Sequence, residues 1–181
     1  MRIIGGFLKG REIHAPQLNA RPTTDFAREG LFNILSNTFN FNELHVLDLF
    51  GGSGSISFEF ASRGCPLITC VEMNHIHTSF IKKTAHQLQL NAIKVVRHNV
   101  FDFISLCTQS YDLIFADPPY DLQRAKDLPQ IIDSARLLRP EGIFILEHSS
   151  AYHFSNAKGF LKMKKYGNVH FSFFSFNVSK N

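Results

Sequence analysis

Short apolar runs alternate with helical segments along most of this 181-residue chain. The apolar runs that we interpret as strands are 45–50, 67–72, 94–97, 111–117, 142–147, 162–166 and 169–177. Such alternation indicates an α/β fold, a mostly parallel sheet with helices on both faces. Gly167-Asn168 separates the last two runs as a hairpin turn would, so we expect the last strand to insert antiparallel.

Length and an apolar content of 44% predict a single domain, 1–181, with a sizeable core. Residues 2–13 are typical of a glycine-punctuated hairpin, and a helix follows with a Thr or Asp available as its N-cap. We therefore expect residues 1–40 to form a small elaboration of a core that spans 41–181. No apolar stretch reaches the length of a membrane span, and no signal peptide opens the chain. Three cysteines without metal-ligand spacing favour a reduced, cytoplasmic compartment.

The motif Asp117-Pro118-Pro119-Tyr120 follows the apolar run 111–116. Proline has no N–H, its fixed φ stiffens the turn, and the residue before it is held extended. A carboxylate, outward-turned carbonyls and an aromatic ring therefore surround one small cavity. This rigid array of acceptors suits an exocyclic amine on a flat heterocycle. An ordinary surface turn accepts the same residues, so the interpretation depends on what accompanies the motif.

A second signal is the glycine cluster at 51–54, between an apolar strand and a helical segment. Glycine permits positive φ and close approach of a ligand to the backbone. In open α/β sheets, ligands bind outside the carboxyl ends of the strands. The next strand ends in Glu72, about twenty residues past the loop, where an acid can bind ribose hydroxyls.

The exact glycine spacing decides between nucleotide classes. A dinucleotide fingerprint counted from Gly52 requires glycine at the position of Ser57, and no P-loop Gly-Lys-Ser/Thr is present. S-adenosylmethionine has ribose and adenine but no phosphate to cradle. Together with Asp117-Pro118-Pro119-Tyr120, the loop therefore favours S-adenosylmethionine, and a dinucleotide oxidoreductase remains an alternative that would need affinity for NAD.

The two ends of the chain are basic, although the overall net charge is only +4. Residues 1–24 hold four cations and one acid, whereas 148–181 hold five lysines and no acid. Basic ends on a near-neutral middle suggest an anionic partner such as RNA. A solvated surface without a partner explains charge alone equally well.

In their order along the chain, these segments resemble the bacterial family of class I S-adenosylmethionine-dependent enzymes that methylates a guanine N2 in 16S ribosomal RNA. The resemblance covers essentially the whole chain. The glycine loop and the Asp-Pro-Pro-Tyr motif are shared by many amino-methyltransferases, whereas the two N-terminal motifs are more specific to the family. The matching segments are Arg2-Ile3-Ile4-Gly5-Gly6, Arg21-Pro22-Thr23-Thr24, Arg28-Glu29-x-Leu31-Phe32-Asn33, Asp48-Leu49-Phe50 with its glycines, Asp117-Pro118-Pro119-Tyr120 and Tyr166-Gly167.

The resemblance implies a Rossmann-like, seven-stranded sheet with an antiparallel last strand. It also implies that the enzyme acts on 16S rRNA in a partly assembled small subunit. It implies no membrane and no obligate protein partner. Two positions depart from the family pattern. Gly51 replaces a common Ala, which should be mild, and Gly30 replaces a usual Thr, at a helix-propensity cost of about 1 kcal/mol.

Within this framework we expect Glu72 to accept both ribose hydroxyls and Met73 to lie against the adenine, whose edge Asn99-Val100 would read. Asp117 and the Pro118 carbonyl would accept the hydrogens of the target amine, and Tyr120 would stack on an unstacked base. The expected cofactor-binding residues are Asp48, Phe50, Gly51, Gly52, Ser53, Gly54, Glu72, Met73, Asn99 and Val100. The expected catalytic residues are Asp117, Pro118, Pro119 and Tyr120, and the expected phosphate contacts are Arg2, Lys9, Arg11, Arg21 and Arg28. The alternative is ordinary surface charge or, for Arg28, an internal salt bridge with Glu29 or Asp25.

No metal site is expected, because the nearest histidine pair, His75-x-His77, lacks a third ligand nearby. Two alternatives to guanine-N2 transfer remain open. An adenine-N6 methyltransferase for DNA or RNA would use the same acceptor array. A non-catalytic RNA-binding assembly protein would retain the cofactor pocket without turnover.

Overall fold

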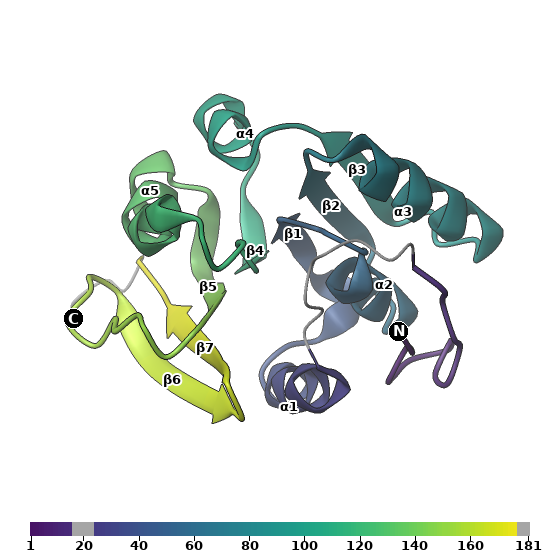
Figure 1. The fold of residues 1–181 in the computed structure, drawn as a ribbon, viewed down its shortest axis with the longest axis horizontal. Coiled ribbons are helices and arrows are strands. Elements are labelled where there is room, and N and C mark those ends of the chain that lie inside the picture. The colour runs from purple at the N-terminus through teal and green to yellow at the C-terminus, as the bar shows by residue number, and fades with distance from the viewer. Residues whose placement is uncertain (16–23, 177–181) are drawn as a thin grey trace.

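The computed structural model describes residues 1–15 and 24–176, and it contains one seven-stranded sheet in the order β3-β2-β1-β4-β5-β7-β6 (Figure 1). This confirms the predicted α/β architecture. Each of the seven apolar runs forms a strand. The strands are β1 (His45–Leu49), β2 (Leu67–Glu72), β3 (Ile93–Arg97), β4 (Tyr111–Ala116), β5 (Leu138–His148), β6 (Phe160–Tyr166) and β7 (Val169–Phe174).

The chain order of the strands reverses at β1, which pairs in parallel with β2 on one side and β4 on the other. The carboxyl ends of these strands therefore share the edge of the sheet at which α/β proteins bind ligands. β7 lies between β5 and β6 and is antiparallel to both, as expected. Its hairpin with β6 turns at Gly167, whose φ of +61° suits a tight two-residue connection.

Helices cover both faces of the sheet, which separates two apolar clusters. The first face carries α1, α2 and α3, and the second carries α4 and α5. Successive strand residues alternate between them, so that Phe115 belongs to the first cluster and Ala116 to the second. The helices are α1 (Asp25–Ser36), α2 (Ser55–Ser62), α3 (His75–Gln87), α4 (Val100–Leu106) and α5 (Leu128–Ala135), with short 3-10 helices η1 (Phe41–Glu43) and η2 (Gln123–Asp127).

Side-chain caps explain where three of the helices begin. The Thr24 hydroxyl accepts from the amide of Ala27 at 3.2 Å at the start of α1. Of the Thr and Asp residues that the sequence offers as N-cap, the structure therefore uses a threonine. Asn74 and Asn99 cap α3 and α4 in the same way. No helix among the described residues is long and apolar enough to cross a membrane.

Several element boundaries differ from the expected ones. β1 ends one residue early because Phe50 adopts a φ of +62°, which is incompatible with a strand. β5 is 11 residues long and begins at Leu138, well before the expected start at 142. The expected N-terminal hairpin forms without regular strands: one antiparallel bridge joins Arg2 to Glu12, and the amides of Ile3, Gly10 and Ile13 donate to the carbonyls of Arg11, Ile3 and Met1.

Candidate active site

The loop between β1 and α2 combines backbone strain with an open side. Phe50, Gly52 and Gly54 all have positive φ, at +62°, +53° and +79°. The amide of Gly54 donates to the carbonyl of Gly51 at 2.7 Å and closes a tight turn. A Cβ built on Gly52 would meet only the carbonyl oxygen of Phe50, at 3.7 Å, so bare backbone faces open space there. This is the position at which a ligand can approach the loop.

The flanking glycines face protein instead. A Cβ on Gly51 would clash with the Sγ of Cys70, and one on Gly54 would lie 2.9 Å from the ring of Phe58. Cys70 thus occupies the volume that an alanine methyl would need, which explains the departure from the family pattern at Gly51. The loop therefore packs against protein at Gly51 and Gly54 and is open at Gly52. Ser53, the next residue of the loop, is half-buried.

Glu72, at the end of β2, is held by the loop that it faces. Its Oε2 accepts from the amide of Gly52 at 2.8 Å, and its Oε1 accepts from the amide of Asn74 at 2.7 Å. The residue is 8% exposed. Each carboxylate oxygen has a further lone pair, so the group can accept ribose hydroxyls while the amides fix its orientation.

Asp48 lies beneath the loop. It is 2% exposed, and its Oδ2 accepts from the hydroxyl of Ser57 at 2.5 Å. Desolvation raises the pKa of Asp48 to about 7, with Glu72 acting in the same direction and the Ser57 hydrogen bond opposing it. Asp48 therefore supports the loop and the start of α2 from below, and its contact with the cofactor stays a prediction.

The three residues expected around the adenine have different environments. Met73 is 64% exposed, so its side chain is available to a ligand beyond β2. Asn99 is exposed, but its side-chain oxygen caps α4 by accepting from the amides of Phe101 and Asp102. Val100 is 5% exposed and packs in the core, so its side chain does not read a base edge.

Asp117-Pro118-Pro119-Tyr120 lies beside the glycine loop. The amide of Asp117 donates to the carbonyl of Leu49 at 3.4 Å, which ties the end of β4 to the end of β1. Pro118 is buried, whereas Pro119 and Tyr120 are exposed and Asp117 is half-buried. The carbonyl of Pro119 accepts from the amide of Leu122 at 2.9 Å and fixes the turn. The structure thus brings together the two motifs that the sequence places about seventy residues apart.

A cavity of about 350 Å³ opens next to Tyr120. Tyr120, Phe26 and Tyr166 supply aromatic surface, and Glu147 of β5 supplies a carboxyl group. The remaining lining residues are Thr24, Gly167, Asn168 and Val169. Sequence reasoning missed Glu147, although an acid at the carboxyl end of the expected strand 142–147 was a usable signal.

Gly30 has a packing role in this region. A Cβ on Gly30 would clash with the ring of Tyr166, which also packs edge-on against Phe26 with ring centroids 5.7 Å apart. Helix α1 therefore approaches the wall of the cavity closely because position 30 has no side chain. This is the physical reason for a glycine where helix propensity alone favours another residue.

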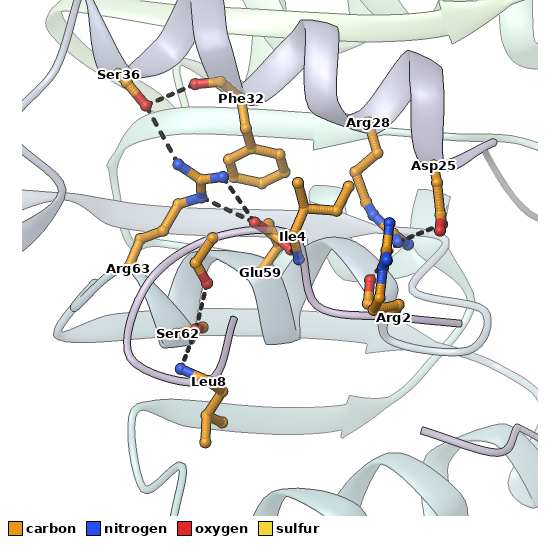
Figure 2. A network of polar contacts seen from close by, with 11 residues as sticks. Arg2, Ile4, Leu8, Asp25, Arg28, Phe32, Ser36, Glu59, Ser62 and Arg63 are labelled. Atoms are coloured by element: carbon orange, nitrogen blue, oxygen red, sulfur yellow. Dashed lines mark hydrogen bonds and ion pairs between the residues drawn. The ribbon is translucent and has the colours of Figure 1, made fainter. Parts of the chain in front are cut away.

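The expected phosphate contacts are not all surface cations. Arg2, Lys9 and Arg11 are exposed, and Arg21 lies outside the described residues. Arg28 is 1% exposed, and its Nη2 donates to the carbonyl of Arg2 at 2.6 Å and to Oδ1 of Asp25 at 2.7 Å (Figure 2). Burial lowers the pKa of Arg28 from its ordinary value, with Asp25 opposing the shift. The expectation for Arg28 is wrong, because it joins α1 to the N-terminal segment internally.

The first ten residues dock on the C-terminal half of α2 (Figure 2). The buried carboxylate of Glu59 accepts from the amide of Ile4 at 2.8 Å and from Nε and Nη2 of Arg63. The hydroxyl of Ser62 donates to the carbonyl of Gly5 at 2.6 Å and accepts from the amide of Leu8. The Arg-Ile-Ile-Gly-Gly motif therefore has a structural role of its own. Within the described part of the chain, no three His, Cys, Asp or Glu residues cluster as metal ligands would.

The sheet order with an antiparallel β7, the open glycine loop after β1 and the fixed acid after β2 define a class I methyltransferase that uses S-adenosylmethionine. The residues fit this cofactor, because Gly52 presents bare backbone to open space and Glu72 is held beside it.

The chain belongs to the family described as "Conserved hypothetical protein 95", whose model matches residues 1–175. It is 32% identical to Ribosomal RNA small subunit methyltransferase D of Buchnera aphidicola subsp. Baizongia pistaciae over 151 residues, which cover 83% of this chain and 76% of that protein. A solved structure described as a putative methyltransferase, yhhF from Escherichia coli, matches with a TM-score of 0.85 at 27% identity, covering 99% of each chain.

A Thermus thermophilus 16S rRNA N2 methyltransferase, RsmC, solved with AdoMet and guanosine, shares the fold at a TM-score of 0.69 and 19% identity. The match covers 87% of this chain and 45% of that one. The family assignment, the fold and the cofactor expected from the sequence are confirmed.

Proposed function

We propose that this enzyme transfers a methyl group from S-adenosylmethionine to the exocyclic N2 of a guanine in 16S ribosomal RNA, within a small subunit or its assembly intermediate. The observation that carries the proposal is the hydrogen bond between the Asp117 amide and the Leu49 carbonyl, which sets the acceptor array beside the open glycine loop. The 32% identity to a small-subunit rRNA methyltransferase supports ribosomal RNA as the substrate class. Such a reaction belongs in the bacterial cytoplasm, where subunits assemble.

The acceptors address a chemical difficulty of the substrate. The N2 lone pair of guanine is delocalised into the ring, so the amine is a poor nucleophile. Asp117 and the Pro118 carbonyl accept its hydrogens, localise the lone pair and aim it at the methyl group. S-adenosylmethionine supplies an electrophilic methyl on its sulfonium.

Positive charge develops on the nitrogen during transfer, and the preplaced carboxylate of Asp117 stabilises it. The alkylated nitrogen is strongly acidic and releases its proton without a powerful base. Alignment of the two reactants contributes about 7–11 kcal/mol toward the barrier in well-oriented systems. Tyr120, which is 50% exposed, offers a stacking surface to a base that has left its RNA stack.

Exposed cations near the N-terminus complete the proposal. Arg2, Lys9 and Arg11 are exposed, and we assign them contacts with RNA phosphates. Binding should then weaken steeply with salt, because each neutralised phosphate releases counterions. Binding that is insensitive to salt would remove these residues from the interface.

The test measures transfer from labelled S-adenosylmethionine to small subunits that lack the modification, beside naked 16S RNA and duplex DNA, followed by nucleoside analysis. N2-methylguanosine in the subunits or their RNA is the expected product. N6-methyladenine would keep the mechanism but change the base. Cofactor binding without transfer to any substrate would favour a non-catalytic assembly protein.

The matched variants are Asp117→Ala and Asp121→Ala, since Asp121 is an exposed acid four residues away. Asp117→Ala should lower kcat by roughly 100- to 1000-fold and leave cofactor affinity nearly unchanged. Asp121→Ala should behave as the parent enzyme. Equal rates for both variants would remove Asp117 from the mechanism.

A further inference from the structure

We propose that the cavity beside Tyr120 holds the target base and that Glu147 selects guanine by accepting a hydrogen bond from its N1–H. This inference rests on the proposed function and names the residue that sets base choice. The Asp-Pro-Pro-Tyr motif alone does not distinguish guanine N2 from adenine N6, because both are exocyclic amines.

The cavity has the walls that a flat base requires. Phe26, Tyr120 and Tyr166 contribute aromatic surface from three separate segments, and the volume is about 350 Å³, within the range of small-ligand pockets. Phe26 and Tyr120 are 67% and 50% exposed, which is unusual for large apolar side chains and suits stacking on an incoming base. Tyr120 belongs to both the cavity and the acceptor motif, so a base in the cavity would lie against that motif.

Strand register places Glu147 next to that motif. In the parallel pair of β4 and β5, Ala116 is opposite Leu146, so Asp117 and Glu147 follow side by side at the sheet edge. Leu146 belongs to the apolar cluster beneath α4 and α5. Glu147 therefore projects from the other face, as does its β7 partner Phe171, which packs with α1 and α2.

The burial of Glu147 makes its selectivity strong. The residue is 2% exposed and lines the cavity, in contrast to the solvated acids of the surface. A carboxylate only accepts hydrogen bonds. Guanine presents a donor at N1, whereas adenine presents a lone pair there, so adenine would set two acceptors against each other. A site built to accept from a substrate N–H discriminates strongly against an analogue that lacks this hydrogen.

Four nucleosides distinguish the contribution of the N1–H to binding from that of the 2-amino group. Guanosine carries both groups and inosine carries only the N1–H. The riboside of 2-aminopurine carries only the N2 amine, and adenosine carries neither. Their dissociation constants are measured by ligand-observed NMR with S-adenosylhomocysteine present, on the parent enzyme, Glu147→Gln and Glu147→Asp. Saturable S-adenosylhomocysteine binding by each variant shows that it is folded.

The parent should bind guanosine and inosine roughly 10-fold or more tightly than 2-aminopurine riboside and adenosine. Glu147→Gln should lose or invert this order, because its amide donates to N1 of adenine and accepts from the N6 amine. Glu147→Asp should keep the order with weaker binding. The proposal would be overturned if the parent enzyme bound all four nucleosides with equal dissociation constants. It would also be overturned if Glu147→Gln kept the parental order of affinities.

The outcome of this experiment distinguishes an error in the role of Glu147 from an error in the proposed function. If subunits acquire N2-methylguanosine while Glu147→Gln retains the parental order of nucleosides, only the role of Glu147 is wrong. If the order collapses in Glu147→Gln but no RNA is methylated, the cavity selects guanine and the reaction is wrong.

Discussion

Two glycine-rich segments of this protein, Gly5-Gly6 and the loop 51–54, look alike in sequence but differ in what fills the space that glycine leaves. At Gly5 and Gly6 that space is occupied by the end of α2, by the guanidinium of Arg63 and the carbonyl of Ser62. At Gly52 it is open apart from one carbonyl oxygen at 3.7 Å. The first segment is a docking surface between parts of the protein, and the second is prepared for a ligand.

The difference shows how a glycine motif should be interpreted. Positive φ occurs in both segments, at +75° for Gly6 and +53° for Gly52, so backbone conformation does not separate them. The deciding quantity is what a Cβ would touch. Substitutions at these positions can therefore break the comparison or sharpen it.

Gly6→Ala should have the largest effect on stability. The added Cβ would clash with the Ser62 carbonyl while φ remains unfavourable, so we expect the free energy of unfolding to fall by about 2–4 kcal/mol in urea denaturation. Gly10→Ala is the control, because Gly10 has a φ of +87° and nothing within 4 Å of its Cβ position. Equal losses for the two variants would mean that docking on α2 contributes nothing beyond φ strain.

Gly51→Ala should cost about 1–3 kcal/mol of unfolding free energy, because its methyl needs the volume occupied by the Cys70 sulfur. Adding Cys70→Ala should recover part of that loss, since the smaller side chain makes room. A double-mutant cycle from urea denaturation should give a favourable coupling of about 1 kcal/mol or more. Strict additivity would contradict the contact.

Gly52→Ala should lower the free energy of unfolding by about 1–2 kcal/mol, no more than Gly10→Ala does, because only φ strain is added. It should also weaken S-adenosylhomocysteine binding at least about tenfold, since the new methyl enters the ligand's space. Isothermal titration calorimetry on both variants checks this. Parental affinity in Gly52→Ala would show that the cofactor does not approach the loop there.

Asp48→Asn should change how stability depends on pH. The folded pKa of about 7 lies above the ordinary carboxyl value, so between about pH 4 and 7 the folded state holds a proton that the unfolded state has lost. The parent's unfolding free energy should therefore fall as pH rises through this window, by at most about 1.4 kcal/mol per unit from this group.

The unfolding free energy of Asp48→Asn should lack this pH-dependent contribution and should therefore change less with pH than that of the parent. Urea denaturation at pH 5, 6, 7 and 8 measures the slopes, with the exposed Asp121→Asn as control. Parallel slopes for the parent and Asp48→Asn would mean that the buried carboxyl is ionised throughout.

Much of the fold followed from local pattern, because buried strands and capped helices are specified by adjacent residues. The seven strands and the antiparallel β7 were predictable in this way, and so was the position of Glu72 beside the glycine loop. The positions at which strands end were less predictable. β1 stops at Leu49 because Phe50 takes a positive φ that no propensity predicts for a phenylalanine.

What the sequence could not show was which charges face inward. Arg28 counted as a surface cation until tertiary packing placed it against Asp25 and the carbonyl of Arg2. Glu147 stands at the carboxyl end of a predicted strand, which was a usable signal, but the cavity around it forms only where α1, Tyr120 and the β6–β7 turn come together. The carbonyl of Arg2 and the walls of the cavity come from segments distant in the chain, which single-sequence patterns do not place, whereas Asp25 is only three residues from Arg28. Gly30 is similar, because its reason is a tyrosine 136 positions away.

The insertion of β7 between β5 and β6 has a consequence for how the protein is made. The glycine loop, β2 and β4 all precede residue 117, whereas the cavity needs the turn at 166–169. At translation rates of about 5–20 residues per second, the glycine loop is synthesised several seconds before the last wall of the cavity beside Tyr120. A nascent chain halted before Tyr166 would thus carry the glycine loop without the enclosed cavity beside Tyr120.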